Sequence, residues 1–435
     1  MTDLGRRDVL RAGAAAAGTA LLAPTARAAE WTGTPEPGAR LRVLRWKQFI
    51  QAEYDGFMDN TRAFTKATGI KVRVDAESWE DIRPKAAVAA NTGAGPDIIM
   101  GTNDDPFKFP DKLIDLTGVA DYLGAKYGGW YPVAQKYGRK GDRWIALPQG
   151  ASGGTMNYRI STMRQAGFET FPRDLPGFLR LCQKMKELGK PPGFALGHAT
   201  GDANGWVLWV LWAHGGKVVD AHNNVVLDSA ETRAALEYAK QLFPTFIEGV
   251  LSWQDPSNNK SFLADQIGLT LNGISIYTVA MNSPDPAVRA IAADMDHANC
   301  PIGPVGRPTE QQNVLNTYVY AYTKYPNAAR EYLRFMWEKP QADHWETTSN
   351  GYIAPPLPAW NDNPVWTADP KVTPFRDVLK YALDDGYDGD LGPASAAVMG
   401  DFIVVDMFAE ACTGAQSVAA AAKRGAERAR RYYKT

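Results

Sequence analysis

The sequence predicts an α/β protein of two lobes, each built on a mainly parallel sheet flanked by helices. Residues 41–100 show a β-α-β-α-β succession of apolar patterns, which is typical of a parallel sheet covered by helices. The β/α pattern is then interrupted and resumes later in the chain. The sequence has 435 residues, which is more than a single hydrophobic core usually supports. We therefore expect a chain that crosses between two lobes more than once.

The first five elements follow from hydrophobic periodicity. Residues 41–44 form a short β run, and residues 70–74 alternate between apolar and polar side chains as a strand does. Residues 53–67 and 80–91 have the spacing of amphipathic helices, each ending near a glycine. Residues 96–100 are expected to form a third strand, which is buried.

The later elements have the same signatures. We expect strands at 143–147, 154–158, 267–271 and 317–322, and helices at 174–188, 205–214, 229–247 and 326–338. The helix at 205–214 is apolar on nearly every side, which predicts that it is buried. A proline-rich stretch covers residues 354–374, and the rest of the chain is expected to be helical apart from 384–393.

Residues 1–28 have the features of an export signal. Arg6 and Arg7 precede an apolar run that is too short to span a bilayer stably, and Ala26-Arg27-Ala28 is a small-x-small cleavage site. The adjacent arginines favour a twin-arginine signal, and an ordinary secretory signal with a chance arginine pair is the alternative. Both interpretations predict an exported, soluble, periplasmic protein, with a linker at residues 29–40.

The composition excludes several classes of function. The formal net charge is −1, so no broad basic field is present for nucleic acid. Three cysteines, far apart and odd in number, provide no disulfide framework, and the five histidines have no metal-binding spacing. The sequence contains neither a P-loop nor a G-x-G-x-x-G motif, so we expect no metal and no cofactor.

Three motifs have ordinary structural interpretations. Residues 150–154 match G-x-S-x-G, but a β run follows them where a nucleophile elbow requires a helix, so a hinge loop is favoured. The aspartates of residues 384–390 lack the twelve-residue calcium loop and its terminal glutamate, which favours a surface turn. The basic C-terminal segment is interpreted as a final helix whose cations offset the helix dipole, with a polyanion site as the alternative.

Four stretches together resemble a known family. Residues 97–116 are similar to its third strand and ligand loop, 143–168 to its crossover into the second lobe, 261–273 to a later strand, and 326–358 to a helix that ends in a G-x-x-P turn. In this order they resemble the extracellular solute-binding proteins of ABC importers, in the carbohydrate group that includes maltose-binding protein.

The resemblance implies the two-lobed periplasmic-binding-protein fold with a ligand cleft between the lobes. By analogy the N-terminal lobe comprises residues 41–147 plus 318–368 and the C-terminal lobe residues 149–312 plus 374–435, with crossings near Pro148, 313–317 and 367–372. It also implies hinge closure on a carbohydrate or polyol ligand, ABC permease subunits as partners, and a monomer without catalytic residues.

The candidate ligand residues combine family position with two physical rules. Ligands of α/β sheets sit at loops after strand ends, and sugars need planar polar groups and aromatic platforms. The candidates are Trp46, Lys47, Gln48, Asn103, Asp104, Ser152, Asp202, Asn204, Trp206, Trp253, Asn258, Asn272, Gly273, Asn316, Tyr318, Tyr352 and Asp401.

Several candidates have a structural alternative. Trp46 and Trp206 could be core residues, and Asp202 or Asn204 could cap a helix. Asp104 falls where the family places a sugar-binding carboxylate, while Ala151 stands near where maltose-binding-like members have an acid, which argues against a maltose-like pattern. Arg45, Lys47 and Arg307 are compatible with an anionic sugar, and the aromatics with an oligosaccharide.

Two other classes of function are compatible with the sequence. An exported glycoside hydrolase needs two paired carboxylates, for which Asp104 and Asp202 are available although nothing in the sequence pairs them. An adhesion module would have no cleft for a small molecule. We expect a binding protein that captures a sugar or sugar-like ligand and delivers it to a transporter.

Overall fold

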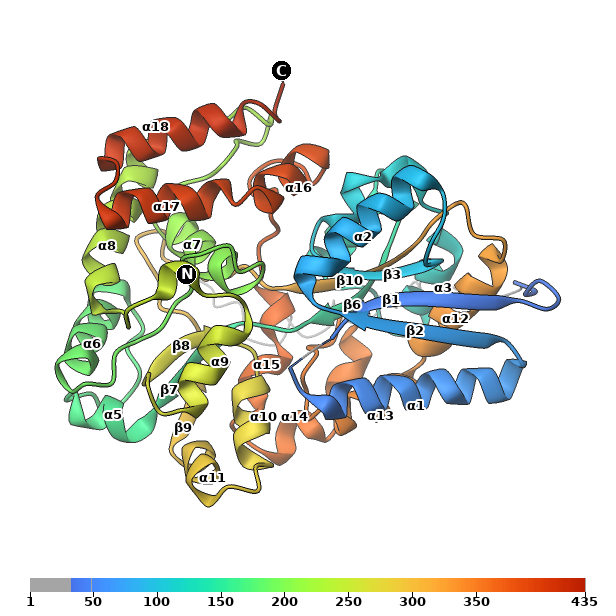
Figure 1. Ribbon diagram of the computed structural model, residues 1–435, viewed down its shortest axis with the longest axis horizontal. Coiled ribbons are helices and arrows are strands. Elements are labelled where there is room, and N and C mark those ends of the chain that lie inside the picture. The colour runs from blue at the N-terminus through green and yellow to red at the C-terminus, as the bar shows by residue number, and fades with distance from the viewer. Residues whose placement is uncertain (1–32, 48, 435) are drawn as a thin grey trace, which may run out of the picture.

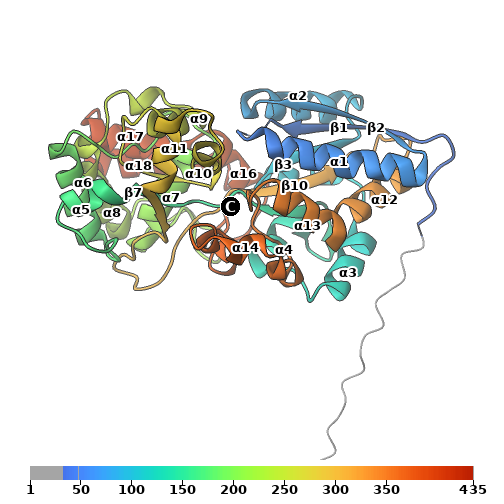
Figure 2. The same cartoon turned by 90° about the horizontal axis from the view of Figure 1, so that it is seen from below.

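The computed structural model describes residues 33–47 and 49–434 and has two lobes (Figure 1). One lobe carries a five-stranded sheet and the other a three-stranded sheet, and helices flank both. The turned view shows the two lobes side by side, with α14 and α16 between them (Figure 2). The predicted two-lobed α/β class is therefore confirmed. The export signal of residues 1–28 and Gln48 lie outside the described residues.

The first-lobe sheet has the strand order β2-β1-β3-β10-β6. Its strands are β1 (Arg40–Trp46), β2 (Lys71–Glu77), β3 (Ile98–Thr102), β6 (Leu147–Ala151) and β10 (Val314–Val319). β1 is parallel to both β2 and β3, while β10 is antiparallel to β3 and β6. From β1 the chain first forms β2 on one side of β1 and then returns to form β3 on the other side of β1. This reversal places a crevice at the carboxyl ends of the strands, where α/β proteins bind ligands.

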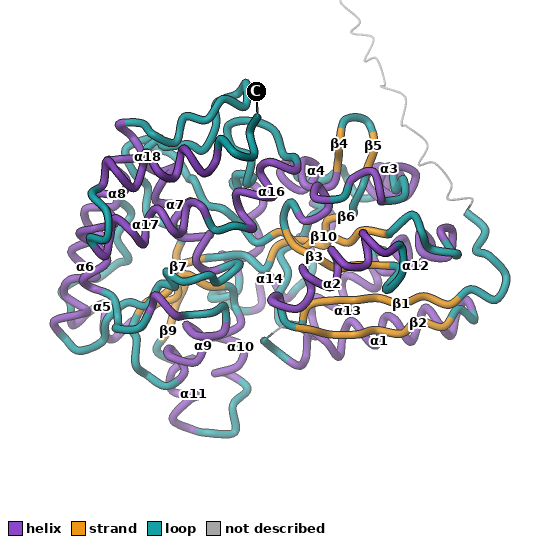
Figure 3. The backbone as a smooth tube through the Cα atoms, turned by 45° about the horizontal axis from the view of Figure 1, so that its top comes forward, coloured by secondary structure: helices purple, strands orange, loops and turns teal. Residues whose placement is uncertain are grey.

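Helices cover this sheet on both sides. They are α1 (Gln51–Thr68), α2 (Trp79–Thr92), α3 (Thr117–Lys126), α4 (Pro132–Gly138), α12 (Pro326–Met336) and α13 (Lys339–Thr348), with the small hairpin β4 (Arg139–Lys140) and β5 (Arg143–Trp144) beside them. α1 packs against α12 and α13, and Figure 3 shows α1 and α13 running along β1 and β2. Burial of Phe57 and Phe64 on one side of α1 attaches that helix to the core.

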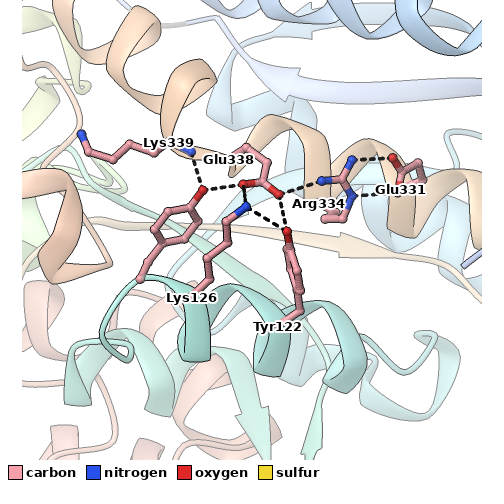
Figure 4. A network of polar contacts seen from close by, with 7 residues as sticks. Tyr122, Lys126, Glu331, Arg334, Glu338 and Lys339 are labelled. Atoms are coloured by element: carbon pink, nitrogen blue, oxygen red, sulfur yellow. Dashed lines mark hydrogen bonds and ion pairs between the residues drawn. The ribbon is translucent and has the colours of Figure 1, made fainter. Parts of the chain in front are cut away.

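A polar network centred on Glu338 joins α3 to the end of α12 (Figure 4). Its carboxylate accepts hydrogen bonds from Tyr122 Oη at 2.8 Å, Lys126 Nζ at 2.7 Å, Arg334 Nη1 at 2.7 Å and the Tyr127 hydroxyl. Burial alone would raise the pKa of Glu338, but these donors together hold it below its ordinary value. The network therefore stabilises the helical layer of the first lobe through a charged carboxylate.

The second-lobe sheet has the order β8-β7-β9, formed by β7 (Thr155–Arg159), β8 (Leu269–Asn272) and β9 (Met295–Ala298). Both pairings are antiparallel, so the expectation of a mainly parallel sheet in this lobe is wrong. β7 is the strand that enters from the other lobe, and it therefore begins at the edge where β8 and β9 end. β10 enters the first lobe in the same way, which explains why it also runs against its neighbour β3.

The second lobe encloses the helix α7 (Asp202–Ala213), and several other helices build the lobe around its sheet. They are α5 (Ile160–Gln165), α6 (Leu175–Glu187), α8 (Ala230–Leu242), α9 (Pro256–Leu263), α10 (Ser275–Met281), α11 (Pro286–Ala293), α17 (Ile403–Thr413) and α18 (Val418–Ala429). The side chains of Trp206, Trp209 and Trp212 are at most 2% exposed. The prediction of a buried helix at 205–214 is confirmed, because a helix apolar on every side must be enclosed by other elements.

The segment between α13 and the last two helices joins the lobes. It contains the short helices α14 (Val365–Ala368), α15 (Thr373–Arg376) and α16 (Pro393–Gly400). α16 packs against the single-turn helix at Asp105–Lys108, which follows β3 in the first lobe. The C-terminal part of the chain therefore contacts the loop that the sequence singled out at Asn103 and Asp104.

Several local features complete the fold. Within the predicted linker, the carboxylate of Glu36 accepts hydrogen bonds from the backbone N–H groups of Asn327 and Ala328 at 2.9 Å, which caps α12. Cys182, Cys300 and Cys412 are buried and free. None of the described helices combines the length and the apolar character that crossing a membrane requires.

Candidate functional site

A cavity of about 320 Å³ lies between the two lobes, at the carboxyl ends of β1, β2 and β8. This volume is within the range of small-molecule sites. Its described lining residues are Trp46, Lys47, Phe49, Ser78, Trp79, Ser152, Gly154, Gly201, Asp202, Gly205, Asp255, Pro256, Asn259, Leu271, Asn272, Gly273, Ser275, Gln311, Asn313 and Tyr352.

The first lobe contributes an aromatic wall. Trp46 ends β1 and stacks on Trp79, which opens α2 directly after β2, with ring centroids 4.7 Å apart and planes 22° apart. Trp46 is half-buried and Trp79 is buried. Phe49 and Tyr352 add two more rings to the lining. Stacked rings held by two strand ends form a rigid apolar surface, suited to the C–H face of a ring-shaped ligand.

The second lobe contributes a carboxylate wall at the N-terminus of α7. Asp255 Oδ1 accepts hydrogen bonds from the backbone N–H groups of Gly201 and Asp202, both at 3.0 Å. Asp202 is the first residue of α7, and its Oδ2 atom has no hydrogen-bond partner among the described residues. Burial, followed by the charge of Asp255, raises the pKa of Asp202 well above its usual range.

A network of amides supports the wall formed by the end of β8. Asn272 Nδ2 donates to Asn259 Oδ1 at 2.6 Å, and Asn259 Nδ2 donates to Ser275 Oγ at 2.7 Å. The Asn272 Oδ1 atom accepts the backbone N–H of Gly273 at 2.6 Å. These bonds fix the orientation of each amide, so Asn272, Asn259 and Ser275 present a preorganised polar surface to the cavity.

The crossing segments close the back of the cavity. Asn313 Nδ2 donates to Ser152 Oγ at 3.1 Å, and the Ser152 backbone N–H donates to the Asn313 carbonyl at 3.1 Å. Gln311 Nε2 donates to Asp385 Oδ1 at 3.1 Å, which links this wall to the C-terminal segment. A ligand in the cavity would therefore contact both lobes and the segments that connect them.

Seven of the residues proposed from the sequence line this cavity. They are Trp46, Lys47, Ser152, Asp202, Asn272, Gly273 and Tyr352. They come from strand ends, from one helix start and from the turn at Gly351. The structure brings them together although the sequence separates them by up to about three hundred positions.

Asn103 and Asn316 do not line the cavity, because each is used to join β3 to β10. Asn103 Oδ1 accepts the backbone N–H of Val314 at 2.8 Å, and Asn316 Nδ2 donates to the carbonyl of Asn103. Both side chains are buried. Their amides add to the strand pairing at this point, where the Asn103 backbone N–H also donates to the Val314 carbonyl at 2.6 Å.

Asp104 is also absent from the lining. Its side chain is fully buried, and neither carboxylate oxygen has a hydrogen-bond partner among the described residues. Burial raises the pKa of Asp104 to about 6, against the opposing effect of Lys108. The carboxyl lies in a buried polar group with Asp385, whose pKa burial and Asp104 also raise.

The side chains of four other candidates contact the protein interior and do not reach the cavity. Trp206 is fully buried and packs against Phe246 and Phe408, and Tyr318 lies in the first-lobe core. Asn204 Nδ2 donates to the Thr200 carbonyl at 3.0 Å, and Asn258 Nδ2 donates to the Leu271 carbonyl at 3.2 Å. None of the four lines the cavity, because each points from its helix or strand into the protein interior.

The last two candidates lie away from the cavity lining. Trp253 is half-buried and packs over Gly193 at the edge of the second-lobe core. Asp401 is exposed and accepts a hydrogen bond from the Tyr432 hydroxyl.

The sequence analysis missed several lining residues, of which Trp79, Asp255 and Asn259 are the most informative. Trp79 lies two residues after the end of β2, and Trp46 is the last residue of β1, so the strand-end rule could have found Trp79 as well. Asp255 and Asn259 lie close to the candidate Asn258, but α9 begins at Pro256, and this helix presents Asn259 and not Asn258 to the cavity. The proline at the first helical position was the available signal.

Together the fold and the cavity define a class of protein that holds a solute between two lobes. Residues 61–374 match the family model described as bacterial extracellular solute-binding protein. The chain belongs to this family. A relative in sequence, described as a probable ABC transporter-binding protein from Deinococcus radiodurans, is 22% identical over 295 residues, which are 65% of this chain and 69% of that protein.

Solved structures agree on the fold. The maltose-bound MalE3 of T. maritima superposes with a TM-score of 0.77 at 19% identity, covering 90% of this chain and 99% of its own. A sugar transporter of Arthrobacter chlorophenolicus A6 with bound laminaribiose gives a TM-score of 0.77 at 18% identity, and the match covers 91% of this chain and 99% of that protein. The GacH receptor of Streptomyces glaucescens, solved unliganded and with acarbose, gives a TM-score of 0.75 at 19% identity, and the match covers 91% of this chain and 99% of that protein. Proteins of this kind bind solutes without transforming them, so the hydrolase alternative is set aside.

Proposed function

We propose that this solute-binding protein captures a carbohydrate or polyol in the interlobe cavity and delivers it to the permease of an ABC importer. One observation carries the proposal. The cavity combines a stacked tryptophan pair from one lobe with a fixed set of amides and carboxylates from the other. This is the combination that a molecule with apolar ring faces and many hydroxyls requires.

The proposal includes the residues that hold the ligand. Trp46 and Trp79 would contact the ring faces, while Asn272, Asn259, Ser152 and Asp202 would bond the hydroxyls. The lobe boundaries implied by the family, a periplasmic location and a monomeric state belong to the same proposal. The two sheets, each in its own lobe, support the division into lobes.

A thermal-shift screen of the mature protein tests this function. A ligand that binds only the folded state at one hundred times its Kd adds about 2.7 kcal/mol to the free energy of unfolding. We expect members of a library of sugars, polyols and sugar acids to raise Tm in a concentration-dependent way. If amino acids, peptides or metal ions raise Tm and no carbohydrate or polyol does, the proposed ligand class is wrong.

A further inference from the structure

The charges around the cavity are unequal. Among the described lining residues, Asp202 and Asp255 carry carboxylates and Lys47 carries a positive charge. Lys47 is exposed, whereas the carboxylates lie at the start of the buried helix α7. The enclosed part of the cavity therefore contains two carboxyl groups and no cation among its described lining residues.

Two cationic side chains that could have bound an anionic sugar, Arg45 and Arg307, do not line the cavity. Arg45 is 1% exposed and binds both oxygens of Glu53, at 2.5 and 2.6 Å. Arg307 donates to the hydroxyl of Tyr387 at 2.7 Å, away from the cavity lining. The arrangement of charges thus disfavours an anionic ligand.

Asp202 is the group that a ligand would satisfy. Its Oδ2 atom has no hydrogen-bond partner among the described residues, and the Asp255 carboxylate adjoins it. An enclosed carboxylate of this kind is stabilised by a cation that can also donate hydrogen bonds, and an ammonium offers three N–H donors. The tryptophan pair that lines the same cavity can attract a cation through an open ring face. A neutral hydroxyl would supply a hydrogen bond but no charge.

From this geometry we infer that the ligand is a basic amino sugar, a carbohydrate whose protonated amine pairs with Asp202 beside Asp255 while its ring lies against Trp46 and Trp79. The inference rests on the proposed function and specifies the ligand class of the same site. The raised pKa of Asp202 agrees with it, because a carboxyl that lacks a cation holds its proton more tightly.

The test is a thermal-shift panel arranged in matched triplets. Each triplet contains a parent sugar, its 2-amino-2-deoxy derivative and the N-acetylated form of that amine, as monosaccharides and as β-1,4- and α-1,4-linked disaccharides. Calorimetry at pH 7 then gives the Kd of every member that raises Tm. We expect the amine to bind about 10- to 100-fold more tightly than its parent, the range of hydrogen bonds to charged groups, and acetylation to abolish the advantage.

Substitution of Asp202 tests whether this carboxylate causes the preference for the amine over its parent sugar. Asp202→Asn keeps the shape and removes the carboxylate, so the amine should lose its advantage, measured as the ratio of the Kd values of the amine and its parent sugar in the same variant. Asp228→Asn is the matched control, because it removes a carboxylate of the same lobe that pairs with Arg233 outside the cavity. The wild-type triplets decide the ligand class even if Asp202→Asn does not fold.

The outcomes separate the two proposals. If the parent or the N-acetyl member binds as tightly as the amine, the amino-sugar inference is overturned and the carbohydrate function stands. If no carbohydrate of any kind raises Tm, the proposed function fails and this inference fails with it. An amine preference that survives in a folded Asp202→Asn protein would overturn the assignment to Asp202.

Discussion

At the scale of single residues, Asp104 shows how burial changes the chemistry of a carboxyl. Burial raises its pKa from 3.8 to about 6. The folded state thus binds the proton more tightly than the unfolded state does. The contribution of Asp104 to the free energy of unfolding is therefore greatest below pH 4 and declines as the pH rises from about 4 to about 6.

Asp104→Asn removes this titration. We expect the variant to have a Tm higher than the wild type by about 2 to 6 °C at pH 7.5, and the difference to disappear near pH 4, where the wild-type carboxyl is protonated. Differential scanning calorimetry at the two pH values measures both. Asp111→Asn is the control, because Asp111 lies on the same lobe and its side chain is 89% exposed. Equal Tm values for wild type and Asp104→Asn at pH 7.5 would contradict the argument.

Substitution of alanine for Trp46 is expected to weaken ligand binding, whereas the same substitution at Trp206 is expected to weaken the fold. Trp46→Ala removes half of the aromatic wall, so ligand affinity should fall by about tenfold or more, as the loss of a buried aromatic contact implies. Trp206→Ala leaves a hole in the second-lobe core and should destabilise the fold by about 3 to 5 kcal/mol. Urea unfolding and calorimetry separate the two effects. A stable Trp206→Ala protein with weakened binding would contradict the assignment of Trp206 to the core.

At the scale of elements, the two crossing segments at residues 152–154 and 310–313 separate two cavities. Gln311 and Asn313 line the interlobe cavity, whereas Glu310 and Gln312 line a second cavity of about 760 Å³ on the other side. Consecutive side chains of an extended segment point in opposite directions, which produces this division. Gln312 also binds both backbone groups of Gly154, at 2.6 and 3.2 Å, and thereby holds the two crossing segments together.

Gly150 is required where β6 passes into the first crossing. Its φ is +134°, and a Cβ added there would lie 2.1 Å from the carbonyl oxygen of Ala354. Gly150→Ala should therefore destabilise the protein by about 2 kcal/mol or more. Gly392→Ala should change stability little, because Gly392 has extended backbone and open space. Chemical denaturation compares the two, and equal stability of both variants would contradict the assignment.

At the scale of the whole molecule, the architecture is that of two lobes joined by short crossing segments, with α16 in contact with the first-lobe loop (Figures 1 and 2). We expect such a molecule to close by rotation about the crossings when a ligand contacts both lobes. The cavity lining comes from both lobes, so a bound ligand stabilises the closed arrangement.

Small-angle X-ray scattering of the mature protein tests the closure. The radius of gyration should decrease when a ligand found by thermal shift is added at saturation, because lobe rotation removes solvent from between the lobes. A carbohydrate that does not raise Tm serves as the control. An unchanged scattering curve at saturating ligand would show that binding does not move the lobes.

The extent of prediction from sequence differs between fold and site. The helices α1, α2, α6 and α7 and the strands β1 to β3 were predicted to within a few residues, because periodicity is a local property of the chain. The antiparallel second sheet was not predicted, because strand direction depends on the lobe from which β7 enters. For the site, the strand-end rule located Trp46 and Asn272 and could not distinguish Asn258 from Asn259.

The sequence by itself determined the alternation of strands and helices, the burial of α7 and membership of a solute-binding family, since each depends on the order and type of neighbouring residues. Only the tertiary structure decided that Trp46 faces the cavity while Trp206 fills a core, and that Asp202 lies beside Asp255. These placements depend on which side of each element faces the other lobe, and packing between distant segments determines that side.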